Sequence, residues 1–361
     1  MVKKWIYILL ILTPLWIFAR SSRAQTEDIN PAEEIFGKNF KLTSDPTSGT
    51  LEYNWPDEEN KFFSIEAKRN VQLISDKLSL KCDELYYNDE TRELKAVGEE
   101  VRIEQGQLTA TCGYFTYEPR TGRSRLEKSP KIITEDEIGR RTITEGDTIT
   151  IERRENSDTR IQVSGSATLR SEEGSKGMPK PEKAVAPAQK MFGRQFEITT
   201  GENGELLYSF NKDNELLSIV AVHSVFITSE DVDINCDRVE YFSKKNQLLA
   251  MGKPVKIFQQ DIVAECGRFE YYPDIGKSLL LENPVILNTD EKGRTMKTRG
   301  KEIDIYQEKE GKTTILVKGK PQIVAEEAEK EQPVREEARL APTPVDESTV
   351  DRIKNLDIVQ D

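Results

Sequence analysis

The sequence is poor in the residues that most catalytic and metal sites need. It has one histidine and four cysteines in 361 residues, and the cysteines lack the C-x-x-C spacing of zinc ligands. It also has no glycine-rich phosphate loop and no G-x-S-x-G nucleophile elbow. Its 64 acidic residues outnumber its 52 basic ones, and the net charge of -12 disfavours binding to nucleic-acid phosphates. We therefore expect no enzyme activity, no metal, no cofactor and no nucleic-acid partner.

Long apolar runs are also scarce, and the one candidate lies at the N-terminus. Lys3 and Lys4 precede an apolar run at residues 5–19, and small residues at Ser22 and Ala24 suit cleavage after Ala24. The run of about 15 residues is short for a membrane span, which needs about 20. We expect residues 1–24 to be an export signal. The alternative is a retained N-terminal membrane anchor.

The rest of the chain contains an internal duplication. Cys82 and Cys112 recur as Cys236 and Cys266, and residues 82–165 match positions 154 further on without a gap at many glycines, prolines and aromatics. Such a fixed period indicates two copies of one structural unit.

The duplication divides the chain into units with polar segments between and after them. We expect the first unit at residues 34–169 and the second at residues 191–324. Residues 170–190 have the Gly, Pro, Lys and Glu content of a solvated linker, and residues 325–361 that of a disordered acidic tail. Within the tail, residues 350–359 could form a short helix on a partner, but we do not predict one there.

Apolar residues alternate along each unit, which predicts β-strands, but the alternation slips by one residue at repeated places. Leu80 and Cys82 share one phase, whereas Leu85 and Tyr87 share the other. A strand keeps both sets on one side only if a bulge bends it. We therefore expect an all-β fold of two tandem troughs, each made of consecutive bent antiparallel strands. The expected corner residues are Cys82, Gly98, Cys112, Gly113, Cys236, Gly252, Cys266 and Gly267.

An exported protein invites a disulfide interpretation of its cysteines. In a simple meander, however, Cys82 and Cys112 lie two strands apart, about 9 to 10 Å, beyond the roughly 7 Å that a disulfide spans. We therefore expect four free buried thiols. Two disulfides would instead require alternate strands to be neighbours.

The remaining candidate side chains have structural explanations. Asp83 and Asp237 are expected to cap backbone groups at the bulges, and recurrent tyrosines such as Tyr87 to pack at strand ends. His223, in a strand-like run, is expected to be an exposed strand residue. The inward phase of the strands defines the trough lining, which either holds an apolar ligand or simply fills a closed core. Its residues are Leu78, Leu80, Leu94, Val101, Ile103, Leu108, Phe115, Ile234, Val239, Val255, Ile257, Ile262 and Phe269.

The repeated pattern resembles the OstA-like (organic solvent tolerance) domain. The pattern is apolar-x-Cys-Asp-x-Leu-x-Tyr, a polar turn, then Leu-x-Ala-x-Gly-x-x-Val-x-Ile, and the second copy has Val239 in place of the Leu that follows Cys-Asp-x. It occupies residues 80–87 with 94–103, and again residues 234–241 with 248–257, and the likeness extends over most of both units. The family usually has alanine at the four cysteine positions, and its bridge protein has one compact domain where this chain has two units.

The resemblance implies an open β-jellyroll in the periplasm whose apolar interior holds the acyl chains of lipopolysaccharide. It also implies end-to-end stacking with jellyroll domains of inner- and outer-membrane components, or with further copies of the chain head to tail. We expect a role in transport between the membranes and in outer-membrane assembly. A protein-binding scaffold of the cell envelope, or a membrane-anchored relay of the same transport system, are the alternatives.

Overall fold

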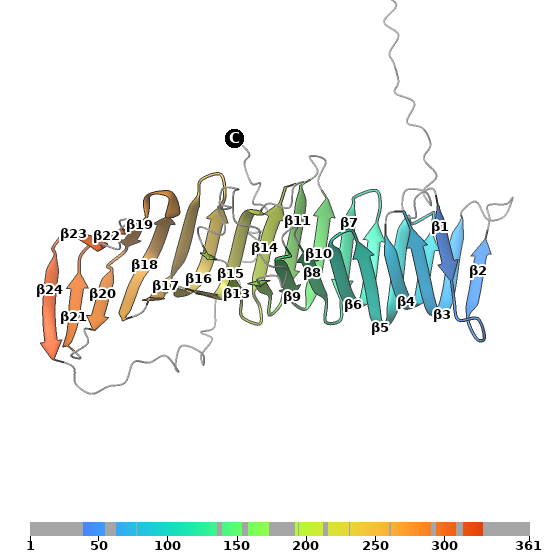
Figure 1. Cartoon of the computed structure of the whole chain (residues 1–361), viewed down its shortest axis with the longest axis horizontal. Coiled ribbons are helices and arrows are strands. Elements are labelled where there is room, and N and C mark those ends of the chain that lie inside the picture. Colours follow the sequence, from blue (N-terminus) through green and yellow to red (C-terminus); the bar gives the residue numbers. More distant parts are fainter. Residues whose placement is uncertain are drawn as a thin grey trace, which may run out of the picture.

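The computed structural model shows an elongated molecule in which antiparallel strands run across the long axis (Figure 1). The signal segment, residues 173–190 and the tail from residue 328 lie outside the residues that it describes. The described residues are 39–54, 63–76, 78–135, 139–153, 158–172, 192–193, 195–211, 216–230, 232–259, 261–289, 294–307 and 313–327.

Twelve strands belong to each sequence unit within the described residues. The first unit has β1 (Phe40–Thr43), β2 (Thr50–Asn54), β3 (Ser64–Ser75), β4 (Ser79–Asn88), β5 (Glu93–Gln105), β6 (Leu108–Glu118), β7 (Arg123–Glu127), β8 (Lys131–Glu135), β9 (Arg141–Glu145), β10 (Thr148–Arg153), β11 (Thr159–Ser164) and β12 (Thr168–Glu172). The second has β13 (Phe196–Thr199), β14 (Glu205–Phe210), β15 (Leu216–Ser229), β16 (Asp233–Phe242), β17 (Gln247–Gln259), β18 (Ile262–Tyr272), β19 (Lys277–Leu281), β20 (Val285–Thr289), β21 (Arg294–Arg299), β22 (Glu302–Gln307), β23 (Thr313–Lys318) and β24 (Gln322–Glu327), with one 3-10 turn at Pro273–Ile275.

The predicted bends occur where the apolar phase slips. The pairing of β4 with β5 shifts register between Lys81 and Glu84, and that of β16 with β17 shifts between Asn235 and Arg238. Eight long strands, β3 to β6 and β15 to β18, each cross such a corner. Elsewhere the strand breaks at the corner, as between β7 and β8. The prediction of consecutive bent antiparallel strands is confirmed.

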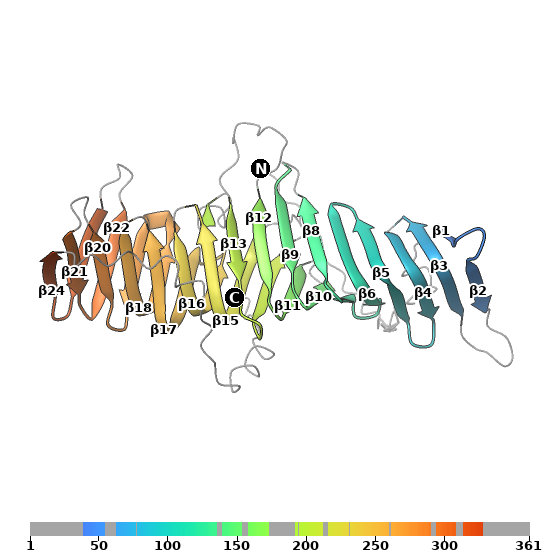
Figure 2. The same cartoon turned by 90° about the horizontal axis from the view of Figure 1, so that it is seen from below.

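Each corner separates two arms, so the bent strands build two sheets over one interior. Sheet A has the order β2-β3-β4-β5-β6-β7-β10-β11-β14-β15-β16-β17-β18-β19-β22-β23. Sheet B has the order β1-β3-β4-β5-β6-β8-β9-β12-β13-β15-β16-β17-β18-β20-β21-β24. Both sheets run the whole length of the molecule (Figure 2).

The two sequence units join directly, strand to strand. β11 pairs with β14 in sheet A, and β12 pairs with β13 in sheet B. Residues 173–191 thus connect two hydrogen-bonded neighbouring strands. The expected boundaries are wrong by a few residues, because residues 170–172 continue β12 and residues 325–327 continue β24. Their backbones complete ladders with β9, β13 and β21, which composition alone does not reveal.

One hydrophobic core extends through both units. It includes Leu73 and Leu94 in the first unit and Val225 and Leu248 in the second, with Leu169 and Leu206 beside the junction. The hydroxyls of Thr144 in β9 and Tyr208 in β14 lie 2.5 Å apart inside it, so a buried hydrogen bond links the units across the two sheets. The fold is therefore all-β, with a single interior.

Candidate lipid-binding interior

All thirteen residues predicted to line the trough contribute to this interior. Ten are buried in the core, and the other three, Leu78, Leu108 and Ile262, are half-buried and pack against it. The phase slip places them together because each bend returns the following apolar residues to the inner side.

The interior is packed with side chains. Hollows of about 390 and 360 Å³ lie at the surface of the described part of the molecule, and none of the thirteen residues lines either one. The first hollow lies over β3, β4 and β5, and the second beside Pro254 and Asn283 at the corners. Leu80, Leu94, Val101, Val239 and Val255 are fully buried against neighbouring side chains, so a ligand among them would need the two sheets to part.

The strands of both sheets end at the margin opposite the corners. Apolar side chains that pack on the core stay half-buried there. We call this margin the seam. Its residues are Leu78, Leu108, Val232 and Ile262 on sheet B, and Phe63, Tyr117, Phe210, Leu216 and Tyr271 on sheet A. The seam runs along the length of both units.

The corners are built from small residues and capped by carboxylates, as predicted. Asp83 Oδ2 accepts a hydrogen bond from the backbone N–H of Glu99 at 2.9 Å, and Asp237 Oδ2 accepts one from Lys253 at 3.1 Å. A Cβ at Gly98 would lie 2.9 Å from that Asp83 oxygen, so a larger residue there would displace the capping carboxylate.

The four cysteines are free and buried at these corners, as predicted. Burial raises the pKa of the Cys82, Cys236 and Cys266 thiols to about 12, and that of Cys112 to about 11. Thiols of this kind are protonated at neutral pH and react slowly. They act as small apolar residues.

The expectation that His223 is an exposed strand residue is wrong. With Ser224 it forms a corner of β15, both residues have positive φ, and the ring is half-buried. Arg69 and Asn70 form the equivalent corner of β3. In the described ranges no group of three or more His, Cys, Asp or Glu side chains could hold a metal, and no helix is long and apolar enough to cross a membrane.

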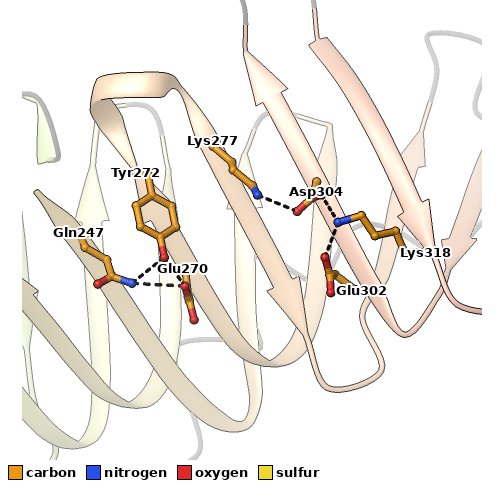
Figure 3. A network of polar contacts seen from close by, with 7 residues as sticks. All are labelled: Gln247, Glu270, Tyr272, Lys277, Glu302, Asp304 and Lys318. Carbon is orange, nitrogen blue, oxygen red and sulfur yellow. Dashed lines mark hydrogen bonds and ion pairs between the residues drawn. The ribbon is translucent and has the colours of Figure 1, made fainter. Parts of the chain in front are cut away.

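A polar network on the outer surface of sheet A was not predicted (Figure 3). The carboxylate of Asp304, only 1% exposed, lies 2.7 Å from Lys318 Nζ and 3.2 Å from Lys277 Nζ. Although burial opposes it, hydrogen bonding from the two lysines holds the pKa of Asp304 below its ordinary value. Glu270, which is also buried, pairs with Arg268 and accepts a hydrogen bond from the Tyr272 hydroxyl.

The two ends of the molecule expose residues whose counterparts at the junction are buried. Leu51 and Tyr53 in β2 are 45% and 59% exposed, whereas Leu206 and Tyr208, at the same register in β14, are at most 1% exposed. The C-terminal end shows the same contrast: Ile315 in β23 is 41% exposed, whereas Ile161, at the same register in β11, is 2% exposed. Both ends therefore carry the apolar residues of a strand junction, and among the described residues β2 pairs only with β3 and β23 only with β22.

Two signals for these features were present in the sequence. The exposed ends follow from the duplication itself, because residues that face a neighbouring unit at the junction have no such neighbour beside β2 and β23 among the described residues. The signal for the network is a comparison of positions 154 apart in the sequence, in which the second unit has Asp304 where the first unit has Thr150.

A scan against protein-family models and a search of curated proteins both found no match.

Proposed function

We propose that the protein is a non-enzymatic periplasmic carrier that shields the acyl chains of lipopolysaccharide between the inner and outer membranes. The observation that supports this best is the single apolar core, which passes without interruption from the first unit into the second. An acyl chain could then move between units without leaving an apolar environment.

The seam is the route by which acyl chains would enter. Its half-buried side chains lie at strand ends, where parting the two sheets breaks no strand pairing. Each methylene transferred from water into the interior contributes about 0.8 kcal/mol, so a few acyl chains would offset the cost of opening the packed core. The phosphates and sugars would remain outside, along the seam.

Photo-crosslinking tests this route. A photoreactive residue at Leu108 or Ile262 should crosslink to lipopolysaccharide in cells. The matched controls are Thr109 and Val263, the next residues on the same strands, whose side chains point to the outer surface of sheet B. Equal crosslinking at seam and control positions, or none at either, would refute lipid binding in the interior.

The ends are proposed to join other jellyroll domains, including further copies of this chain. The junction predicts the register: Ile315 would lie opposite Tyr53 and Val317 opposite Leu51, as Ile161 lies opposite Tyr208 and Val163 opposite Leu206. Main-chain hydrogen bonds of this kind join exposed strand edges between proteins.

A protein-binding scaffold of the cell envelope is the second candidate. It is favoured by the packed interior, which would then be an ordinary core. In that case the ends would still bind jellyroll domains, whereas the seam positions would crosslink to no lipid. The same experiment therefore separates the two functions.

A further inference from the structure

The outer surface of sheet A carries one row of residues that crosses all sixteen strands in register. Its first-unit half contains no aliphatic residue and its second-unit half contains five. The first half is Glu52, Glu66, Tyr86, Lys95, Thr116, Arg125, Thr150 and Gln162. The second half is Leu207, Val220, Glu240, Leu249, Glu270, Leu279, Asp304 and Leu316. We call this second half the outer row.

The neighbouring positions reinforce this contrast. Val222, Met251 and Leu281 lie next to the outer row on the same surface. Leu207, Val220 and Val222 form a hydrophobic cluster separate from the main core, with Phe242 packed on it. The second unit thus has an apolar patch on a surface that faces away from the interior; Leu207, Val220 and Val222 in it are only 2–6% exposed, whereas Leu316 at its far end is 48% exposed.

The acidic members of the outer row are already neutralised within the chain. Glu240 pairs with Arg238 at 2.6 Å, Glu270 with Arg268 at 2.5 Å, and Asp304 with two lysines. Buried carboxylates tolerate loss of water only when they are paired in this way. The surface can therefore be covered by an apolar segment without leaving a charge unpaired.

We propose that the C-terminal segment, residues 350–359, docks on the outer row. Five of its ten residues are Val, Ile or Leu, against three of the 22 residues that precede it after β24. Val350, Ile353 and Leu356 are spaced by three, so they would share one face of a helix. This is the one cluster of aliphatic residues in an otherwise polar tail.

The tail is long enough to reach every part of the patch. The 22 residues between Glu327 and Val350 can extend over about 70 Å. From β23 to β14 the row crosses seven strand spacings, about 34 Å. A docked tail would cover the second unit only, because the equivalent surface of the first unit is polar.

Cysteine crosslinking in the full-length mature chain tests the proposal. The variant L279C/I353C should form an intramolecular disulfide at least tenfold faster than R125C/I353C, in which the first cysteine takes the matching position of the first unit. Equal rates would overturn the proposal, because the tail would then visit both units alike. A bond formed mainly between two molecules would also overturn it and identify a second copy of the chain as the occupant.

Hydrogen exchange gives an independent test without new cysteines. Amides of residues 350–359 should exchange at least tenfold more slowly than those of residues 335–345. The variant L249K/L279R, which installs the first-unit residues, should abolish this difference, whereas R125L should leave it unchanged. Uniformly fast exchange along the wild-type tail, or protection that persists in a folded L249K/L279R variant, would contradict docking on the outer row.

Discussion

The first and second units differ far more on their outer surfaces than in their interiors. Leu80, Val101 and Phe115 of the first interior correspond to Ile234, Val255 and Phe269 of the second, with little change in volume. On the outside of sheet A, by contrast, Lys95 and Arg125 correspond to Leu249 and Leu279. Packing restricts what the interior can accept, whereas an outer surface is restricted only by what binds to it. The outer surface is therefore where the two units differ most in chemistry.

The junction and the free ends offer a second comparison and the largest expected effect. Ile161→Arg would bury an unpaired charge between β10 and β14 and should cost about 4 kcal/mol or more. Ile315→Arg, at the matching position of the free end, should leave stability almost unchanged but weaken end-to-end assembly. Urea unfolding and sedimentation velocity measure the two results. Equal destabilisation by both substitutions would show that the ends are not open junctions.

Truncating the core at matched positions should test whether the two interiors act as one. Leu94→Ala and Leu248→Ala each remove a fully buried side chain and should each cost about 2–5 kcal/mol. Because both sheets are continuous, we expect one unfolding transition that shifts by a similar amount in both variants. Two transitions, of which each substitution moves only one, would mean that the units unfold independently.

The charged network of the second unit should give a smaller effect, which depends on pH. Asp304→Asn removes a buried carboxylate from two lysines and should cost about 1–3 kcal/mol at neutral pH. The pKa of Asp304 is lowered from its ordinary 3.8, so its stabilisation is present above about pH 3.8 and is lost as pH falls through the folded-state value.

Urea unfolding of wild type and Asp304→Asn across pH 2 to 7 measures this dependence. The two free energies of unfolding should converge at the acidic limit. Thr150→Val, at the matching first-unit position, provides the control and should show no pH-dependent difference from wild type. A constant gap between wild type and Asp304→Asn at all pH values would contradict an electrostatic role for Asp304.

The cysteines should give the smallest effect and the least difference between units. Cys82→Ala and Cys236→Ala replace one small buried side chain with another and should each cost no more than about 1.5 kcal/mol. In the folded protein all four thiols should resist alkylation at pH 8, since their pKa values lie near 11 to 12. Rapid labelling of any one of them in the native state would show that its corner opens readily.

The strand bends and the residues that line the interior could be predicted, because the spacing of apolar residues along the sequence determines both. The slip between Cys82 and Leu85 determines the corner, and alternation on either side determines which side chains point inward. The continuity of the sheet could not be predicted, because residues 170–190 have the composition of a linker whether they separate two domains or connect two paired strands. The seam could not be predicted either, since alternation does not tell whether Leu108 is fully buried within a strand or half-buried at a strand end.

The outer row could not be recognised from alternation alone, because scattered aliphatic residues on a strand's outer phase are ordinary in folded proteins. Its meaning depends on pairing in register across eight strands, which places Leu249 and Leu279 on either side of Glu270. The pairing of Asp304 with Lys318 likewise joins residues on neighbouring strands of sheet A.

Native mass spectrometry of the purified mature protein with lipopolysaccharide tests the central claim most directly. The account predicts a discrete protein–lipopolysaccharide complex that is lost in Leu108→Glu and Ile262→Glu, at the seam, and kept in Thr109→Glu and Val263→Glu, on the outer surface of sheet B. No complex with the wild-type protein, or a complex that all four variants form equally, would contradict an interior that holds acyl chains.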